Sequence, residues 1–278
     1  MNRRTVLAIA RKDIQATTAN LQVWLPMLIV PLLLGIGVPV AMVLAFRFGA
    51  ASISPEDAQV MLDWVDRLPV VELGTVWPTL NEMSQKLIYL SANYMLAPFF
   101  LIIPLMTASV ISADSFAGEK ERGTLETLLF APVDMRSLFV GKVMASFVPA
   151  VAVSLVTFFL CGLTVNLAAW PLFHRVIFPQ LNWLPLMLLV IPGVSLLAIL
   201  INVFVSARVA TFQAAYQISG VVVLPVLLLV VGQVTGVLVL NGWVAILVGL
   251  MVAVIDFMLL GKVMRHLNRN QLFESQVR

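Results

Sequence analysis

The sequence has few charged residues. Only 11% of its 278 residues are Asp, Glu, Lys or Arg, whereas 61% are apolar and the mean hydropathy is +1.01. A soluble globular domain has about 25% charged and about 45–50% apolar residues, so this composition excludes that class. It predicts an integral membrane protein, in which basic residues set the orientation and the net charge of +3 indicates no nucleic-acid role.

Residues that carry common chemistry are also scarce. The only cysteine, Cys161, falls inside an apolar run, which excludes an intrachain disulfide. The two histidines, His174 and His266, lie outside the apolar runs, which excludes a His-Glu-x-x-His metalloprotease. Neither Gly141-Lys142 nor Gly261-Lys262 is followed by Ser or Thr, so no Walker A motif for ATP is present. We expect this chain to bind no cofactor or metal and to carry no catalytic residue.

Six long apolar runs predict an all-α integral membrane fold with six transmembrane helices. Each run is near or above the roughly 20 residues that the hydrocarbon core requires. Residues 1–20 alternate basic and apolar side chains at helical spacing, which predicts an amphipathic helix on an anionic membrane surface. A signal peptide is the alternative, but the first run is far longer than a signal core of about 7–15 residues. The membrane domain is then 21–278, with spans at about 22–46, 88–112, 138–165, 184–206, 212–231 and 243–261.

The basic residues predict the orientation. With the N-terminus inside, 13 of the 17 Lys and Arg face the cytoplasm, and only Arg47, Arg67, Lys86 and Arg175 lie outside. The positive-inside rule therefore predicts a multi-pass protein of the cytoplasmic membrane with both termini and the 113–137 loop in the cytoplasm. The outer loop, about 47–87, contains an amphipathic stretch that fits either a structural lid or a substrate-binding loop.

The most informative segment is 114–132, DSFAGEKERGTLETLLFAP. Its charges end an apolar run, Gly123 breaks the backbone, and Thr124 is placed as the N-cap of a short helix. That helix, Leu125 to Phe130, places Leu125, Leu128 and Leu129 at helical spacing, which predicts a docking face for another protein. An ordinary solvated loop with its leucines on the membrane surface is the alternative.

This segment resembles the cytoplasmic coupling segment of ABC-2 type (type V) transporter permeases. The family pattern is an acidic pair, then Gly-Thr-Leu-Glu, two leucines and a nearby proline, and the run Ile9 to Asp13 also resembles the family's opening. The resemblance implies the permease subunit of an exporter, paired with a second permease chain and two ATPase subunits that hold ATP and Mg²⁺. The coupling residues it implies are Glu119, Glu121, Arg122, Gly123, Thr124, Leu125, Glu126, Leu128 and Leu129, followed by Pro132.

Polar residues inside the spans indicate two further candidate sites. Tyr89 and Asn93 share a face of the second span, and Gln213, Tyr216 and Gln217 share a face of the fifth, so they fit either a substrate path or helix packing.

Asp256 is the only acid well inside a span. It supports an alternative function, an ATP-independent channel or secondary transporter, unless it lies near the boundary and meets water or Arg208.

Overall fold

The computed structural model describes residues 2–49, 76–124, 134–209, 211–235 and 237–266, together with residues 59, 62, 63, 65, 68 and 73. Regular secondary structure in these ranges is helical, and six of the helices are long and apolar enough to cross a membrane. The shortest, Gly242–Val263, has 22 residues, so at 1.5 Å per residue it spans about 33 Å, slightly more than the hydrocarbon core. The predicted all-α fold with six spans is confirmed, and the chain is a multi-pass membrane protein.

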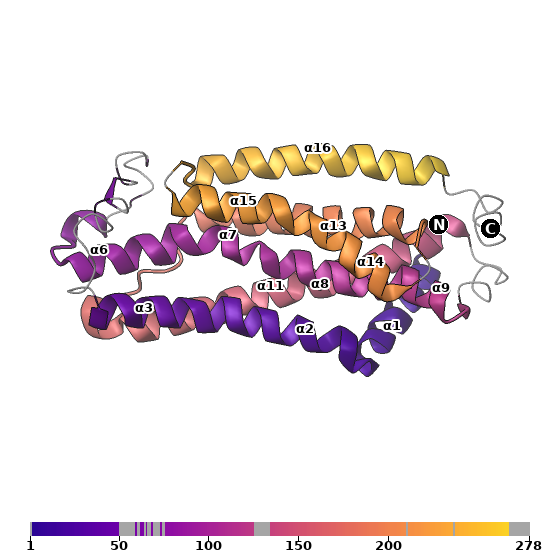
Figure 1. The fold of residues 1–278 in the computed structure, drawn as a ribbon, viewed down its shortest axis with the longest axis horizontal. Coiled ribbons are helices and arrows are strands. Elements are labelled where there is room, and N and C mark those ends of the chain that lie inside the picture. Colours follow the sequence, from indigo (N-terminus) through magenta and orange to yellow (C-terminus); the bar gives the residue numbers. More distant parts are fainter. Residues whose placement is uncertain are drawn as a thin grey trace.

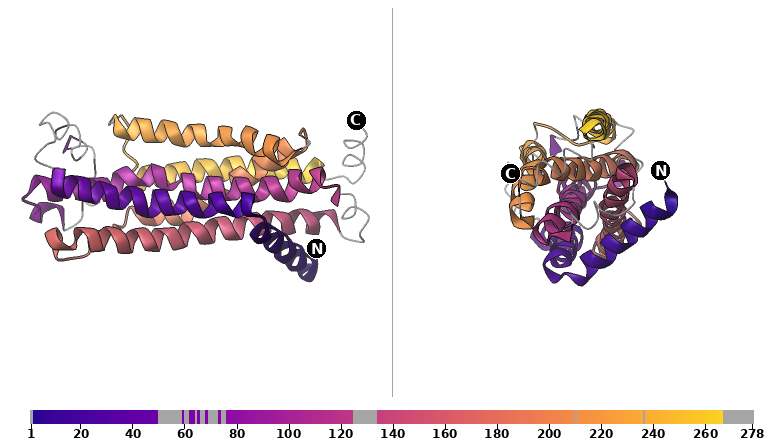
Figure 2. Two further views of the ribbon diagram at one scale, coloured as in Figure 1. Left: turned by 60° about the horizontal axis from the view of Figure 1, so that its bottom comes forward. Right: turned by 90° about the vertical axis from the view of Figure 1, so that its right-hand side faces the viewer.

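The N-terminal helix α1 (Arg3–Ala19) turns sharply into the first span. Asn2 caps α1, since its side-chain oxygen accepts a hydrogen bond from the backbone N–H of Arg4 at 3.0 Å. Asn20 alone separates α1 from the next helix, and α1 is inclined to the bundle at the end where this span begins (Figure 2). The span consists of α2 (Leu21–Leu32), the π turn η1 (Leu33–Gly37) and α3 (Val38–Gly49).

The second and third spans are helices of 39 residues each. The second continues through the charged residues to Glu121, although the hydropathy pattern predicts that the span ends near residue 112. Backbone hydrogen bonds persist after a helix leaves the apolar layer, and this one ends only where Gly123 adopts a φ of 70°. The second span consists of α6 (Met83–Leu90), η5 (Ser91–Met95), α7 (Leu96–Phe100), α8 (Ile102–Ala113), η6 (Asp114–Gly118) and α9 (Glu119–Glu121), and the third is α11 (Met135–Phe173).

The second span forms the centre of the bundle and the fifth lies at its edge. Of the most apolar window of each helix, 78% is buried inside the chain for the second span, but only 17% for the fifth. The fifth span therefore turns apolar side chains outward, toward lipid or another chain. The remaining spans are α12 (Trp183–Pro185) with η7 (Leu186–Val190) and α13 (Ile191–Ser206); α14 (Phe212–Ser219) with η8 (Gly220–Val222) and α15 (Val223–Val234); and α16 (Gly242–His266).

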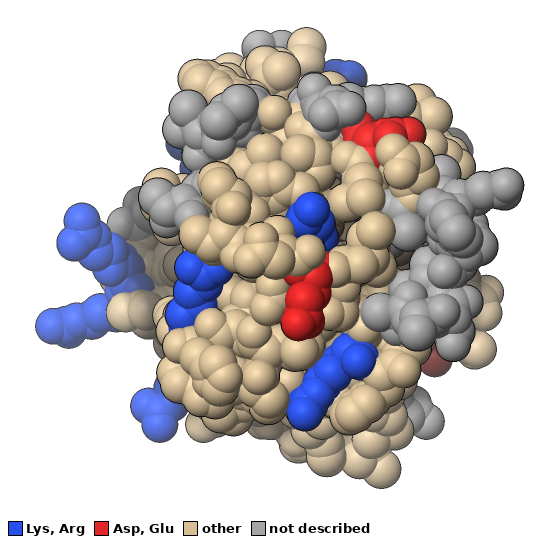
Figure 3. Space-filling view, turned by 90° about the vertical axis from the view of Figure 1, so that its left-hand side faces the viewer, with Lys and Arg blue, Asp and Glu red and all other residues tan. Residues whose placement is uncertain are grey.

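The two ends of the bundle differ. The helices α1, α9 and α14 lie together at one end, which we call the α1 end, and α6 lies at the opposite end, the α6 end (Figure 1). Described basic and acidic side chains are scattered over a mostly uncharged surface at the α6 end (Figure 3). The ion pairs among the described residues lie instead at the α1 end, where three of the helices that carry the paired side chains meet.

Candidate functional site

Lys142 of α11 is a buried cation whose side chain is 2% exposed. Its Nζ donates a hydrogen bond to the backbone carbonyl of Ser115 at 2.6 Å and forms ion pairs with the carboxylates of Glu119 and Asp13, the latter at 3.4 Å. An ammonium group removed from water is strongly unfavourable unless it has such partners. Lys142 is therefore held by two other segments of the chain.

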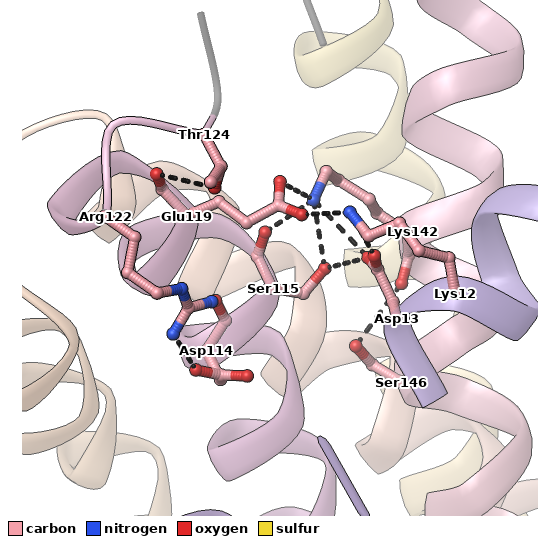
Figure 4. A network of polar contacts seen from close by, with 9 residues as sticks. All are labelled: Lys12, Asp13, Asp114, Ser115, Glu119, Arg122, Thr124, Lys142 and Ser146. Atoms are coloured by element: carbon pink, nitrogen blue, oxygen red, sulfur yellow. Dashed lines mark hydrogen bonds and ion pairs between the residues drawn. The ribbon is translucent and has the colours of Figure 1, made fainter. Parts of the chain in front are cut away.

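Asp13 of α1 and Lys12 beside it complete this group. The carboxylate of Asp13 accepts a hydrogen bond from Ser115 Oγ at 2.6 Å, and its other oxygen lies 2.9 Å from Lys12 Nζ. Lys12 also pairs with Glu119. Two cations thus face two anions. We call Lys12, Asp13, Ser115, Glu119 and Lys142 the ionic cluster (Figure 4).

The cluster shifts the pKa values of its members in α1. Burial alone would raise the pKa of Asp13, but Lys142, Ser115 and Lys12 outweigh it and hold that pKa below 3.8. Burial alone would lower the pKa of Lys12, but Glu119 and Asp13 outweigh it and hold that pKa above 10.5. Both groups are therefore charged at neutral pH, and the contacts of the cluster favour their charged forms.

The ionic cluster joins three elements that are far apart in the sequence. Asp13 belongs to α1, Glu119 to the end of the second span, and Lys142 to the third span (Figure 4). The approach of α1 to α11 depends on Gly141, because a Cβ there would lie 2.9 Å from the side chain of Ile9. A second contact, from the backbone N–H of Asn2 to Ser137 Oγ at 3.2 Å, holds the start of α1 against α11.

The end of the second span also contacts the start of the fifth span. The carboxylate of Glu121 accepts a hydrogen bond from the backbone N–H of Phe212 at 2.8 Å, and Lys120 Nζ donates to the carbonyl of Val209 at 3.2 Å. The first N–H groups of a helix lack intrahelical partners and carry partial positive charge, so a carboxylate there stabilises α14 by about 0.3–1 kcal/mol. Residues 119–121 therefore contact α1, α11 and α14.

Arg122 folds back along the helix that it follows. Its Nη1 donates to Asp114 Oδ1 at 2.9 Å. Gly118 makes room for this ion pair, because a Cβ at that position would lie 2.8 Å from Asp114 Oδ1 and 3.1 Å from Arg122 Nη1. Thr124, predicted as an N-cap, donates its hydroxyl to the carbonyl of Glu119 at 3.2 Å and so satisfies the end of the preceding helix.

The structure describes part of the predicted coupling set. Glu119 is 5% exposed and its carboxylate is engaged in the ionic cluster, whereas Glu121 reaches α14. Gly123 and Thr124 lie where the helix ends. The predicted docking face, with Leu125, Glu126, Leu128 and Leu129, lies outside the described residues.

The two groups of predicted path residues lie at opposite ends of the bundle (Figure 1). At the α6 end, Tyr89 is fully buried and donates its hydroxyl to the Leu73 carbonyl at 2.8 Å. Asn93 is also fully buried. Its side-chain amide donates a hydrogen bond to the carbonyl of Ile177, in the segment before the fourth span, at 3.1 Å. Both hydrogen bonds lie within one chain.

The residues predicted on the fifth span lie at the α1 end. Gln213 and Gln217 are exposed on α14, opposite its buried residues Ala215 and Ser219. Tyr216 is half-buried, with its ring stacked on Phe212 at a centroid distance of 6.2 Å. Within one chain the structure therefore does not bring these residues together with Tyr89 and Asn93.

Asp256 lies on the buried face of α16 and is 4% exposed. Its Oδ1 has no hydrogen-bond partner, and the nearby backbone is that of Gly193 in α13, where a Cβ would lie 3.8 Å from Oδ2. Among the described residues it forms no ion pair, with Arg208 or with any other cation.

Sequence reasoning did not single out Asp13, Ser115 and Lys142, although a signal was present. Asp13 shares the buried face of α1 with Ile9, Ala10 and Thr17. Lys142 shares a buried face of α11 with Leu138 and Ala145. Opposite charges on the apolar faces of two helices predict that the helices pack against each other through that pair.

The chain is thus a helical membrane protein with six spans, in which the charged end of the second span is held against an N-terminal helix outside the membrane domain. The sequence matches the family described as ABC-2 family transporter protein over residues 7–268. The match covers most of the chain, which therefore belongs to the ABC-2 transporter family, as the 114–132 resemblance predicts. The chain is a membrane transport subunit of an ATP-binding cassette system, a family that implies an ABC ATPase partner. None of the curated proteins matches the sequence.

Proposed function

We propose that this chain is the permease subunit of an ABC exporter of the cytoplasmic membrane, driven by a separate ATPase that binds ATP and Mg²⁺. The ionic cluster is the observation that carries the proposal. Through Glu119, the segment that would contact the ATPase is joined to α1 and to the third span, and through Glu121 it is joined to the fifth.

These contacts provide a physical route for coupling. Hydrogen bonds to charged groups contribute about 1.5–3 kcal/mol each, and breaking a buried ion pair by removing one partner costs about 3–5 kcal/mol. When a docked ATPase moves the segment after Glu121, α1, α11 and the start of α14 move with it, because the alternative is to separate buried charges.

The proposed assembly contains two permease chains and two ATPase copies, with both termini of each permease in the cytoplasm. The fifth span supports the second chain, because Gln213 and Gln217 are exposed on α14, at the start of a span of whose most apolar window only 17% is buried inside the chain. Amide side chains in hydrocarbon need hydrogen-bond partners, so we place a second permease chain against this face, with Tyr216 and these glutamines beside the substrate path. The mass of the detergent-purified, transport-active complex tests this, and an active assembly with one permease chain would refute it.

The coupling role is tested at the docking face. Leu128→Asp places an unpaired charge in an apolar contact, so the variant should lose the co-purified ATPase and transport while expression and monodispersity are retained. Leu181→Asp, at the α6 end with a side chain that is 80% exposed, is the matched control and should retain both activities. Glu126→Ala removes only a first-turn acid, which costs a helix about 0.3–1 kcal/mol, so a larger defect means direct contact with the ATPase. If Leu128→Asp retains its ATPase and the parental transport rate, the coupling assignment is wrong.

A second candidate function, an ATP-independent channel or secondary transporter, is favoured by the unpartnered oxygen of Asp256. A carboxyl group buried without a partner suits a proton or cation pathway. The permease chain alone, reconstituted in proteoliposomes under an ion gradient, should then carry a flux that Asp256→Asn abolishes. Flux that appears only with the ATPase and survives Asp256→Asn rejects this candidate.

A further inference from the structure

The second half of the fifth span, α15, has few buried side chains. The structure describes all 12 of its residues, and the buried ones are Val226 and Gln233. The others are exposed or half-buried, and Leu228 is 72% exposed. Apolar burial inside the chain therefore contributes little to the position of α15, although the helix packs against α7 of the second span (Figure 1).

Gln233 is 1% exposed, and both ends of its amide form hydrogen bonds. Nε2 donates to the backbone carbonyl of Tyr94 in η5 at 2.7 Å, and Oε1 accepts from the backbone N–H of Leu240 at 3.3 Å. In a regular helix the carbonyl of Tyr94 would accept from residue 98, but Pro98 has no N–H. Gln233 therefore supplies a donor where the second span lacks one.

The preceding carbonyl of the same π turn has a similar partner from the fourth span. The side-chain amide of Asn182 donates to the carbonyl of Asn93 at 2.9 Å. The two spans differ in the rest of their packing, because 50% of the most apolar window of the fourth span is buried inside the chain, against 17% for the fifth. The fourth span has other contacts that hold it in place, whereas the second half of the fifth depends on Gln233.

The first half of the fifth span, α14, is held separately. The carboxylate of Glu121 accepts from the N–H of Phe212, and the hydroxyl of Ser219 donates to Asn202 Oδ1 of the fourth span at 2.7 Å. Between the two halves lies the 3₁₀ turn η8, and a Cβ at Gly220 would have no neighbour within 4 Å. A 3₁₀ turn inside a longer helix often marks a hinge, and here there is room for movement.

We propose that Gln233 is a latch. Its hydrogen bond to Tyr94 holds α15 against the second span, and when that bond breaks α15 swings away about η8 while α14 stays in place. The swing also releases Leu240, whose N–H is held by the same amide. The latch is a pair of neutral hydrogen bonds, so it opens without separating a packed apolar core. This inference concerns the conformation of the permease chain alone, and its test requires neither the ATPase nor a transported substrate.

The experiment measures thiol modification at Ala97→Cys in the purified full chain. Ala97 is 4% exposed on α7 and lines the same recess as Leu240, so a thiol there should react with N-ethylmaleimide when the latch is open. The rate follows the population of the open state when closing is fast. Gln233→Met keeps the length of the side chain and removes both hydrogen bonds, so it should raise the rate about ten-fold.

Two controls separate an open latch from a loosened fold. Thr235→Val removes an exposed hydroxyl that donates to the carbonyl of Val231 in its own helix at 2.9 Å, and the rate at position 97 should stay within about two-fold of the parental rate. Cys161 is fully buried in the third span and is modified in the same molecules, where peptide mass spectrometry resolves it. Its rate should be the same in Gln233→Met as in the parental chain.

Gly220→Ala tests the hinge. Alanine favours the helical backbone and restricts the alternatives, so adding this change to Gln233→Met should lower the rate at position 97 about three-fold. An unchanged rate would overturn the assignment of the hinge to η8.

Three results would overturn the latch itself. The first is a rate at position 97 in Gln233→Met within about two-fold of the parental rate. The second is an equal increase in Thr235→Val. The third is an equal increase at Cys161, which would show that Gln233 stabilises the whole fold. If Gln233→Met does not yield folded protein, Gln233→Asn, which keeps the amide but is one methylene shorter, is measured in its place with the same criteria.

Discussion

Replacing Lys142 with Met tests the ionic cluster directly. Methionine is of similar length and apolar, so the change removes the central cation and leaves little void. The carboxylates of Asp13 and Glu119, which are 4% and 5% exposed, then share only the half-exposed Lys12. Loss of one partner from a buried ion pair costs about 3–5 kcal/mol, and we expect the free energy of unfolding to fall by that amount.

A second variant separates charge from packing. Glu119→Gln added to Lys142→Met removes one anion together with the cation, so the remaining negative charge of Asp13 is again balanced by the positive charge of Lys12. The double variant should be at least about 1 kcal/mol more stable than Lys142→Met alone, because residues in one ion-pair network do not act additively.

The free energy of unfolding should depend on pH differently in the parental chain and in Lys142→Met. In the parental chain the pKa of Asp13 is held below its usual 3.8, so its contribution to stability is present above pH 3.8 and is lost only as the pH falls below that. In Lys142→Met, Asp13 loses Lys142, the largest of the contacts that lower its pKa, while burial still raises that pKa, so protonation of Asp13 favours the folded state of the variant. Between pH 7 and pH 5 the variant should therefore gain stability while the contribution of Asp13 in the parental chain stays constant.

The assay is unfolding by SDS titration of the purified chain, with mixed micelles of fixed composition. Lys86→Met at the α6 end, where the lysine forms no ion pair within the described residues, is the control and should change the free energy of unfolding by at most about 0.5 kcal/mol. A loss below about 1 kcal/mol in Lys142→Met, or strict additivity in the double variant, would show that the members of the ionic cluster do not depend on one another.

Three further changes test individual contacts. Gln217→Leu should lower transport or substrate-stimulated ATPase activity without changing the melting temperature, and a lower melting temperature with unchanged activity per folded molecule would make Gln217 a packing residue. Gly141→Ala places a Cβ 2.9 Å from Ile9 and should cost about 1–3 kcal/mol in thermal unfolding, whereas Gly261→Ala, which has open space, should not destabilise. If both alanine variants have the same thermal stability, the packing of α1 does not depend on the close approach of Ile9 to Gly141. Glu121→Gln should weaken the start of α14 by about 0.3–1 kcal/mol, measured as faster amide exchange there; unchanged exchange would contradict the contact.

Much of the fold was predictable because lipid constrains sequence strongly. A span must satisfy its backbone groups internally and present apolar side chains over about 20 residues. Each of the six spans can therefore be recognised from its own stretch of sequence. The extent of the second span was not predictable in this way. Its last turns are charged, and only the φ of Gly123 and the contacts of Glu119 and Glu121 show where the helix ends.

The candidate site was predictable only in part. The order of residues in 114–132 identified the family, which the match over residues 7–268 confirms. Tyr89 and Asn93 resemble Gln213 and Gln217 in sequence, since all are polar residues in apolar runs. The structure separates them, because the first two are fully buried with backbone partners and the last two are exposed.

The sequence alone is enough to predict a helical membrane protein with six spans, because hydropathy is a property of consecutive residues. It also determined the family, because the coupling pattern is contiguous. In contrast, the buried cluster of Asp13, Glu119 and Lys142 can be seen only in three dimensions, since these residues are up to 129 positions apart. Each charge taken alone fits a solvated position near a membrane boundary. It is the packing of α1 on α11, with Ile9 against Gly141, that removes these charges from water and makes each depend on the others.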